Sequence, residues 1–150
     1  MSIPRYGVSG EWANLTGSLI PADSLLINRG DVIYRATGAQ MLRNTVTAVT
    51  SSSGTATFDW SLGDYFTITL SENVTTITIS NTPGSGFGTT IAIEITQDST
   101  ARTVAWPASF RWEGGSAGAV STGNGDVDLL ILTTFDNGTT WDATLSNDRS

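Results

Sequence analysis

The clearest structural signal in this chain lies in residues 126–135, which read Asp126-Val127-Asp128-Leu129-Leu130-Ile131-Leu132-Thr133-Thr134-Phe135. Successive side chains of a β-strand point to opposite faces of the sheet. One phase holds the residues that we expect to face a core: Val127, Leu129, Ile131 and Phe135. Leu130 and Leu132 fall in the opposite phase, where a solvated sheet face shows polar groups. We therefore predict that a second surface covers Leu130 and Leu132, either the N-terminal part of the chain folded back or a neighbouring copy.

Shorter runs of the same alternation occur on both sides of this strand. Hydrophobic side chains recur at every second position, and runs of Gly, Asp, Asn and Pro separate them, which is typical of strands and turns. We expect strands at residues 56–62, 66–70, 74–80, 91–95, 104–106, 110–112, 126–135 and 141–145, with a bulge at Thr75-Thr76. This series predicts an all-β fold, an antiparallel β-sandwich of the jelly-roll kind. Trp60 and Trp141 occupy the inward phase of their strands, so we expect both in the core.

Residues 1–50 have a different character, because their hydrophobic residues come singly between Gly, Pro, Ser and Asn. We divide the chain at the connector-like residues 50–54 into an extended attachment segment, residues 1–50, and a β-sandwich module, residues 51–150. Within the segment, residues 21–27 suit a helical turn and residues 31–35 a short strand. Its hydrophobic residues lack a periodic core face and are candidates for docking onto another surface: Trp12, Leu15, Leu19, Ile20, Leu25, Leu26 and Ile27.

The composition removes most catalytic chemistry. The chain has 150 residues, no His, no Cys and a formal net charge of −7. Cysteine nucleophiles, Ser-His-Asp triads, histidine bases and zinc sites are excluded within this sequence, so we expect no enzyme activity, no cofactor and no metal. The seven basic residues are scattered arginines, which argues against nucleic acid as a partner. No hydrophobic run is long enough for a spanning helix, and we expect no membrane insertion.

Three acidic residues near the C-terminus carry the oxygen ligands that Ca²⁺ prefers. Asp126, Asp128 and Asp136 do not have the spacing of an EF-hand loop, and we interpret them as turn-capping and solvated carboxylates. We expect Asp126 and Asp128 at the exposed start of their strand. Glycosidases use a pair of carboxylates, but no further motif here supports such a pair.

Seven blocks follow one another after residue 55: residues 63–70, 73–79, 91–98, 102–107, 110–115, 126–128 and 136–141. The most specific are Trp106-Pro107 with Trp112-Glu113-Gly114-Gly115, and Asp136-Asn137-Gly138-Thr139-Thr140-Trp141. In this order they resemble a β-rich module at the C-termini of tail-fibre and related appendage proteins of tailed bacteriophages. Residues 30–42 resemble a linker element found before such modules. The loop after Gly115 lacks the proline that these modules often carry.

The resemblance implies a non-enzymatic virion protein, a homotrimer assembled in the host cytoplasm, that docks to other virion proteins through its N-terminal segment. It also implies host contact, through a surface polysaccharide or another receptor, and Trp106 and Trp112 are candidates for that contact. Leu130 and Leu132 are then candidates for the oligomer interface. A capsid decoration or head-fibre protein is the alternative, and a polysaccharide depolymerase is a third hypothesis.

Overall fold

A computed structural model of the chain describes residues 24–29, 32–37 and 45–149, with side chains over residues 45–149. These residues form strands, two short 3₁₀-helices and loops, and none of them is in an α-helix. The expectation of an all-β chain is therefore confirmed for the described part. The chain divides into two compact units, Met1–Leu42 and Arg43–Ser150.

The described residues of the first unit form two antiparallel strands. Strand β1 (Ser24–Arg29) pairs with β2 (Val32–Thr37), and Leu26 lies opposite Arg35 in the register. The expected helical turn at residues 21–27 is wrong from Ser24 onward, because a pairing partner lies close by in the sequence and a single helical turn is costly to nucleate. The expected strand at 31–35 overlaps β2 at residues 32–35, and β2 continues to Thr37. Three of the candidate docking residues, Leu25, Leu26 and Ile27, lie in β1. The other four lie outside the described residues: Trp12, Leu15, Leu19 and Ile20.

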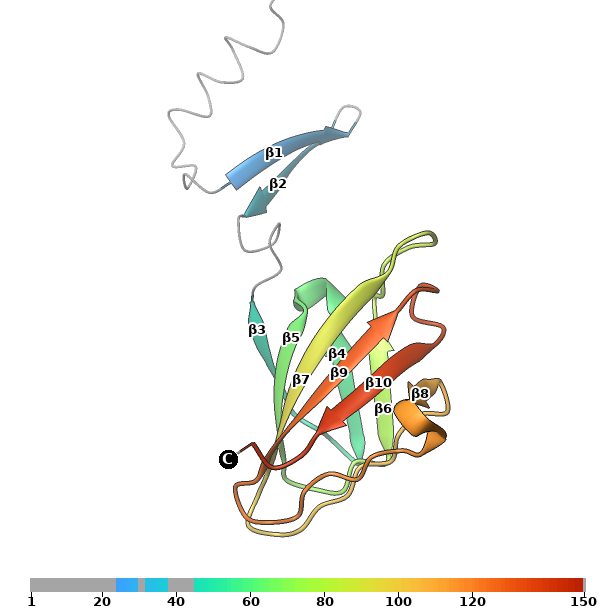
Figure 1. Cartoon of the computed structure of the whole chain (residues 1–150). Helices are drawn as coiled ribbons and strands as arrows, with labels where there is room; N and C mark the ends of the chain where they lie inside the picture. Colours follow the sequence, from blue (N-terminus) through green and yellow to red (C-terminus); the bar gives the residue numbers. More distant parts are fainter. Residues whose placement is uncertain (1–23, 30–31, 38–44, 150) are drawn as a thin grey trace, which may run out of the picture. The chain divides into compact units, whose positions relative to one another are not determined.

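A six-stranded sheet dominates the second unit (Figure 1). Its strands, in spatial order, are β3 (Val46–Val49), β5 (Tyr65–Leu70), β7 (Thr89–Gln97), β9 (Val127–Thr134), β10 (Trp141–Ser146) and β8 (Phe110–Trp112). The β7–β9 and β9–β10 pairs are antiparallel, whereas β3–β5, β5–β7 and β10–β8 are parallel. The sheet is mixed, and the expectation of a wholly antiparallel fold is wrong. Strand β3 belongs to this sheet, so the module begins before residue 51.

Alternation between two layers explains two of the parallel pairs, β3–β5 and β5–β7. Strands β4 (Thr55–Asp59) and β6 (Thr76–Ser80) pair in parallel as a separate two-stranded sheet. The chain therefore passes from β3 to β4, back to β5, out to β6 and back to β7. Each strand of the small sheet serves as the crossover that parallel neighbours in the large sheet require. The sequence does not indicate these crossovers, because alternating strands joined by short turns have the same local pattern in an antiparallel hairpin.

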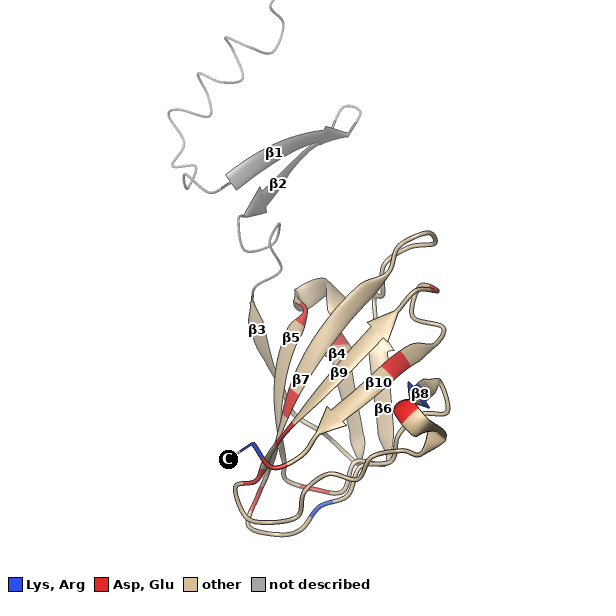
Figure 2. Cartoon of the chain, in the orientation of Figure 1, with Lys and Arg blue, Asp and Glu red and all other residues tan. Residues whose placement is uncertain are grey.

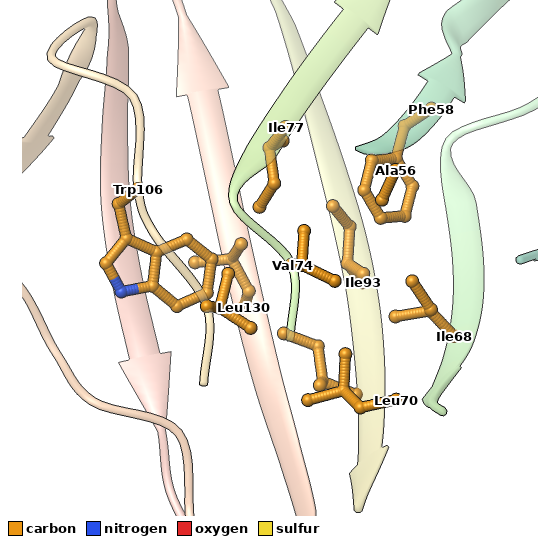
Figure 3. Close-up of a pocket in the computed structure, with 11 residues that line it drawn as sticks. Ala56, Phe58, Ile68, Leu70, Val74, Ile77, Ile93, Trp106 and Leu130 are labelled. Carbon is orange, nitrogen blue, oxygen red and sulfur yellow. The ribbon is translucent and has the colours of Figure 1, made fainter. Parts of the chain in front are cut away.

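The hydrophobic core lies between these layers. Phe58 of β4 contacts Phe66 of β5 edge to face, with ring centroids 5.5 Å apart and planes at 81°. Figure 3 shows side chains of both layers around a small void, with Phe58 and Ile68 toward one side and Trp106 toward the other. The void measures about 10 Å³ and is wholly lined by apolar residues and Trp106, so it is a packing defect and has no room for a ligand.

The face assignment of β9 is the main correction. Leu130 and Leu132 are 0% exposed in the core, whereas Leu129 and Ile131 on the other face are half-buried. Pairing with β7 sets this phase, because Leu130 lies opposite Ile93 and both are in the core. Leu130 and Leu132 are thus not an oligomer interface, since neither is accessible to another chain. Phe135, which we expected in the core, is 79% exposed.

Smaller differences concern the other strands. Strand β4 ends at Asp59, whose carboxylate accepts from Ser61 N at 2.9 Å and starts the 3₁₀-helix η1 (Trp60–Leu62). Trp60 is half-buried against the core and donates its indole N–H to Thr89 Oγ1 at 3.0 Å. Trp141 is 2% exposed, so its expected core position is confirmed.

Two expectations concern irregular pairing. Before β6, the N–H groups of Thr75 and Thr76 both donate to the carbonyl of Gly54, at 2.8 and 3.0 Å, which is the irregularity expected there. The expected strand at 104–106 is reduced to one bridge between Val104 and Val74.

Candidate functional site

The two tryptophans that the sequence offered for surface contact lie together. The ring centroids of Trp106 and Trp112 are 5.3 Å apart, and Phe110 stacks on Trp106 at 6.3 Å. Trp106 donates its indole N–H to the carbonyl of Gly118 at 2.6 Å and also lines the core void (Figure 3). It is therefore a packing residue that connects the core with the loop after β8. Trp112 is half-buried and lies on the outer side of the cluster, where it lines a groove.

This groove, which we call the Trp112 groove, has a volume of about 290 Å³. Its lining residues come from the end of β8, the following loop and β10: Trp112, Glu113, Ser116, Gly118, Ala143, Thr144 and Leu145. Strand β8 pairs with β10 only as far as Ala143. The groove lies where β10 continues past its neighbour to Thr144 and Leu145.

Glycines shape the loop that closes the groove. Gly114 and Gly115, in the 3₁₀-helix η2 (Glu113–Gly115), have φ angles of 72° and 77°, in the left-handed region that favours glycine. Gly118 packs against the groove's own lining, because a Cβ there would lie 2.9 Å from Leu145 Cδ2 and 3.5 Å from Trp112 Cζ3. The loop therefore approaches Leu145 more closely than a residue with a side chain allows.

The groove carries one acidic group. Glu113 is exposed, and none of the described residues forms a hydrogen bond or an ion pair with its carboxylate. The nearby Arg111 forms an ion pair with Asp142 at 3.0 Å, with both side chains more than half exposed. Figure 2 shows this distribution, with a basic position on β8, an acidic one in the turn after it and another on β10. Since Arg111 is engaged, the groove itself has an acidic and hydroxyl-bearing character.

The acids that the sequence suggested as capping groups do cap loops. Asp126 Oδ2 accepts from Gly123 N at 2.6 Å, and Asp136 Oδ2 accepts from the Thr140 hydroxyl at 2.6 Å. Asp128 differs from the expectation of an exposed strand start: it is 1% exposed and bonded to Ser121. Within the described residues, no three acidic side chains gather in a way that suits a metal ion.

Three carboxyl groups among the described residues have a lowered pKa, which favours their ionised form. Hydrogen bonds from Thr140 lower the pKa of Asp136 to about 2. The side-chain hydrogen bond from Arg102 lowers the pKa of Asp98, and that from Ser61 lowers the pKa of Asp59. A general acid near neutral pH needs a raised pKa, and these three shifts go the other way.

Comparison with known proteins finds no match for this chain. No family model matches the chain, and neither a curated protein nor a solved structure matches it. Among the described residues, no helix is both long and apolar enough to cross a membrane.

Sequence reasoning identified the tryptophans of this region but not the groove. Trp112 was singled out, whereas Ser116, Gly118 and Thr144 were not, since only the end of β8 brings them together. The Gly114-Gly115 pair directly after Trp112 was the available signal, because it indicates a sharp change of direction beside an aromatic residue.

Proposed function

We propose that this chain is a structural component of a tailed-bacteriophage virion, a tail-fibre or spike-type appendage protein. Its N-terminal segment docks to the particle, and its β-module contacts the host surface. The observation that carries the proposal is that the blocks resembling the appendage module are the building elements of one unit. Block 63–70 contains β5, block 91–98 overlaps β7, block 110–115 is β8 with η2, and block 136–141 leads into β10.

The division of the chain supports separate attachment and contact parts. The first unit ends at Leu42, and the sheet of the second begins at Val46. We propose that the second unit is a two-layer β-sandwich of mixed strand direction, with β4 and β6 as the smaller layer over the six-stranded sheet. An experimental structure of the assembled protein tests that reading.

We also propose a homotrimer, through the outer face of the large sheet and not through Leu130 and Leu132. A row of apolar side chains crosses this face in register: Val46, Tyr65, Ala92 and Ile131. Val46 is 61% and Tyr65 49% exposed, and Leu129 lies half-buried one row away. Contiguous apolar surface of this kind marks interaction sites, and three such faces around a threefold axis would cover it.

The test is the position of the chain on the particle. Gold-labelled antibody against residues 43–150 should decorate tail tips or fibres, and particles made with a chain lacking residues 1–42 should carry no label although the shortened chain stays folded. Label on the head places the protein with capsid decoration or head-fibre proteins. Absence of the full-length chain from purified particles contradicts the proposal. Shortening of host polysaccharide by the purified protein moves it to the depolymerases.

A further inference from the structure

We infer that the Trp112 groove is a carbohydrate subsite that binds one or two units of a neutral glycan and rejects glycans built from acidic sugars. The inference rests on the proposed function, because it names the chemical class of the host-surface ligand. It also assigns the contact to one place on the module, the end of β8, where strand β10 continues past β8.

The wall of the groove suits the apolar face of a sugar ring. The C–H groups of a pyranose carry partial positive charge, and an indole face carries negative charge from its quadrupole. Trp112 is held in place before any ligand arrives, because Trp106 packs on it at 5.3 Å and Trp106 itself is tied to Gly118 O at 2.6 Å. A rigid wall lowers the entropy lost on binding.

Polar groups line the same groove. The Glu113 carboxylate and the Ser116 and Thr144 hydroxyls are exposed, and none of them has a hydrogen-bond partner among the described residues. A carboxylate accepts from two sugar hydroxyls, and a serine or threonine hydroxyl both donates and accepts. Bonds to a charged acceptor are the stronger kind, so Glu113 is the main polar contact expected.

Size and charge select the occupant. A volume of about 290 Å³ is at the lower end of the roughly 300–1,000 Å³ of small-molecule sites, which suits one or two sugar rings and is too small for a folded partner. The groove's charged group is acidic, and the chain has a net charge of −7. Arg111 is engaged with Asp142 and does not line the groove, so a uronate carboxylate would meet Glu113 without a compensating cation.

Titration calorimetry of the full chain tests the inference with three probes: maltotetraose, chitotetraose and trigalacturonate. At least one of the two neutral oligosaccharides should bind saturably with a Kd on the order of 1 mM, and trigalacturonate should bind at least tenfold more weakly. Glu113→Gln should raise the Kd for the neutral oligosaccharides about tenfold and should reduce the difference between that Kd and the Kd for trigalacturonate. Glu94→Gln is the matched control, since Glu94 is an exposed carboxylate outside the groove, and it should change neither value.

A second variant tests the indole wall. Trp112→Ala should abolish binding of the neutral oligosaccharides, and Trp112→Phe, which keeps an aromatic wall, should retain part of it. Near-ultraviolet circular dichroism measures the folded fraction of each variant, so that binding is compared at equal amounts of folded protein. The inference is overturned by no saturable binding of either neutral probe up to about 20 mM. Equal binding of trigalacturonate, or no effect of Glu113→Gln, overturns it as well. If the chain is present on virions but binds no glycan, the subsite inference is wrong and the appendage proposal stands. If the chain binds glycan but is absent from virions, the appendage proposal is wrong and the subsite inference stands.

Discussion

Asp128 accepts hydrogen bonds from both the backbone N–H and the hydroxyl of Ser121, at 2.6 and 2.7 Å. The carboxylate is 1% exposed and accepts a third bond from the backbone N–H of Asp148 at 2.9 Å. One buried acid on β9 thus holds both the long loop before that strand and the chain after β10. Burial of this carboxyl group is acceptable because three donors held by the fold satisfy its oxygens.

Asp128→Ala should lower the free energy of unfolding by about 3 kcal/mol, because it leaves the donors of Ser121 and Asp148 without their acceptor. Asp128→Asn keeps one acceptor oxygen and should cost about half as much. Urea unfolding followed by tryptophan fluorescence measures both. The control is Asp142→Ala, which removes an exposed ion pair and should cost less than about 1 kcal/mol. Equal losses at the two positions would show that the Asp128 network adds nothing.

Leu130→Ala should lower the free energy of unfolding by about 3 kcal/mol, because Leu130 is 0% exposed and its removal leaves a cavity beside Ile93. Leu62→Ala makes the same chemical change at a side chain that is 55% exposed, and should cost within about 0.5 kcal/mol. Urea unfolding of both variants checks the face assignment of β9. A loss at Leu130 no larger than that at Leu62 would contradict it.

Ile131→Asp should separate the subunits without unfolding them. The side chain is half-buried on the outer face, in register with Ala92, so a charge there meets solvent in the single chain and a desolvated contact in the trimer. Light scattering should give the mass of three chains for the parent and of one chain for the variant, with unchanged far-ultraviolet circular dichroism. Thr57→Asp, an exposed change on β4, should keep the parent's mass. A monomeric parent contradicts the trimer outright.

Stability should fall between about pH 4 and pH 2, in part because of Asp136. Hydrogen bonds from Thr140 lower the pKa of Asp136 from 3.8 to about 2, so the folded state binds this proton less readily than the unfolded state. The resulting stabilisation is fully present above pH 3.8 and is lost as the pH falls toward 2. Thr140→Val removes the hydroxyl donor and should flatten this part of the curve of Tm against pH, measured by calorimetry from pH 2 to 6 at constant ionic strength. Parallel curves for parent and variant would contradict the role of Thr140.

Local sequence was sufficient wherever one face of a strand is clearly apolar. Phe66, Ile68 and Leu70 alternate with threonines. Ile91, Ile93 and Ile95 alternate with Ala92 and Glu94, and all six hydrophobic residues are buried as their phase predicts. The reason is that a period of two and a single apolar face leave one arrangement that removes the hydrophobic side chains from water. The turn at residues 136–140 and the buried Trp141 were predictable on the same ground.

The partner of each strand and the phase of β9 were settled only in the tertiary structure. Both faces of β9 are apolar, so its own alternation permits either phase, and pairing with the isoleucines of β7 selects Leu130 and Leu132 for the core. The parallel pairing could not be predicted from the sequence either, because it requires β4 and β6 to lie in a second layer. The turns that precede these two strands have the composition of hairpin turns. The Trp112 groove has the same origin: it exists because β8 stops at Trp112 while β10 continues, and strand length relative to a neighbour is a property of the sheet and not of either segment.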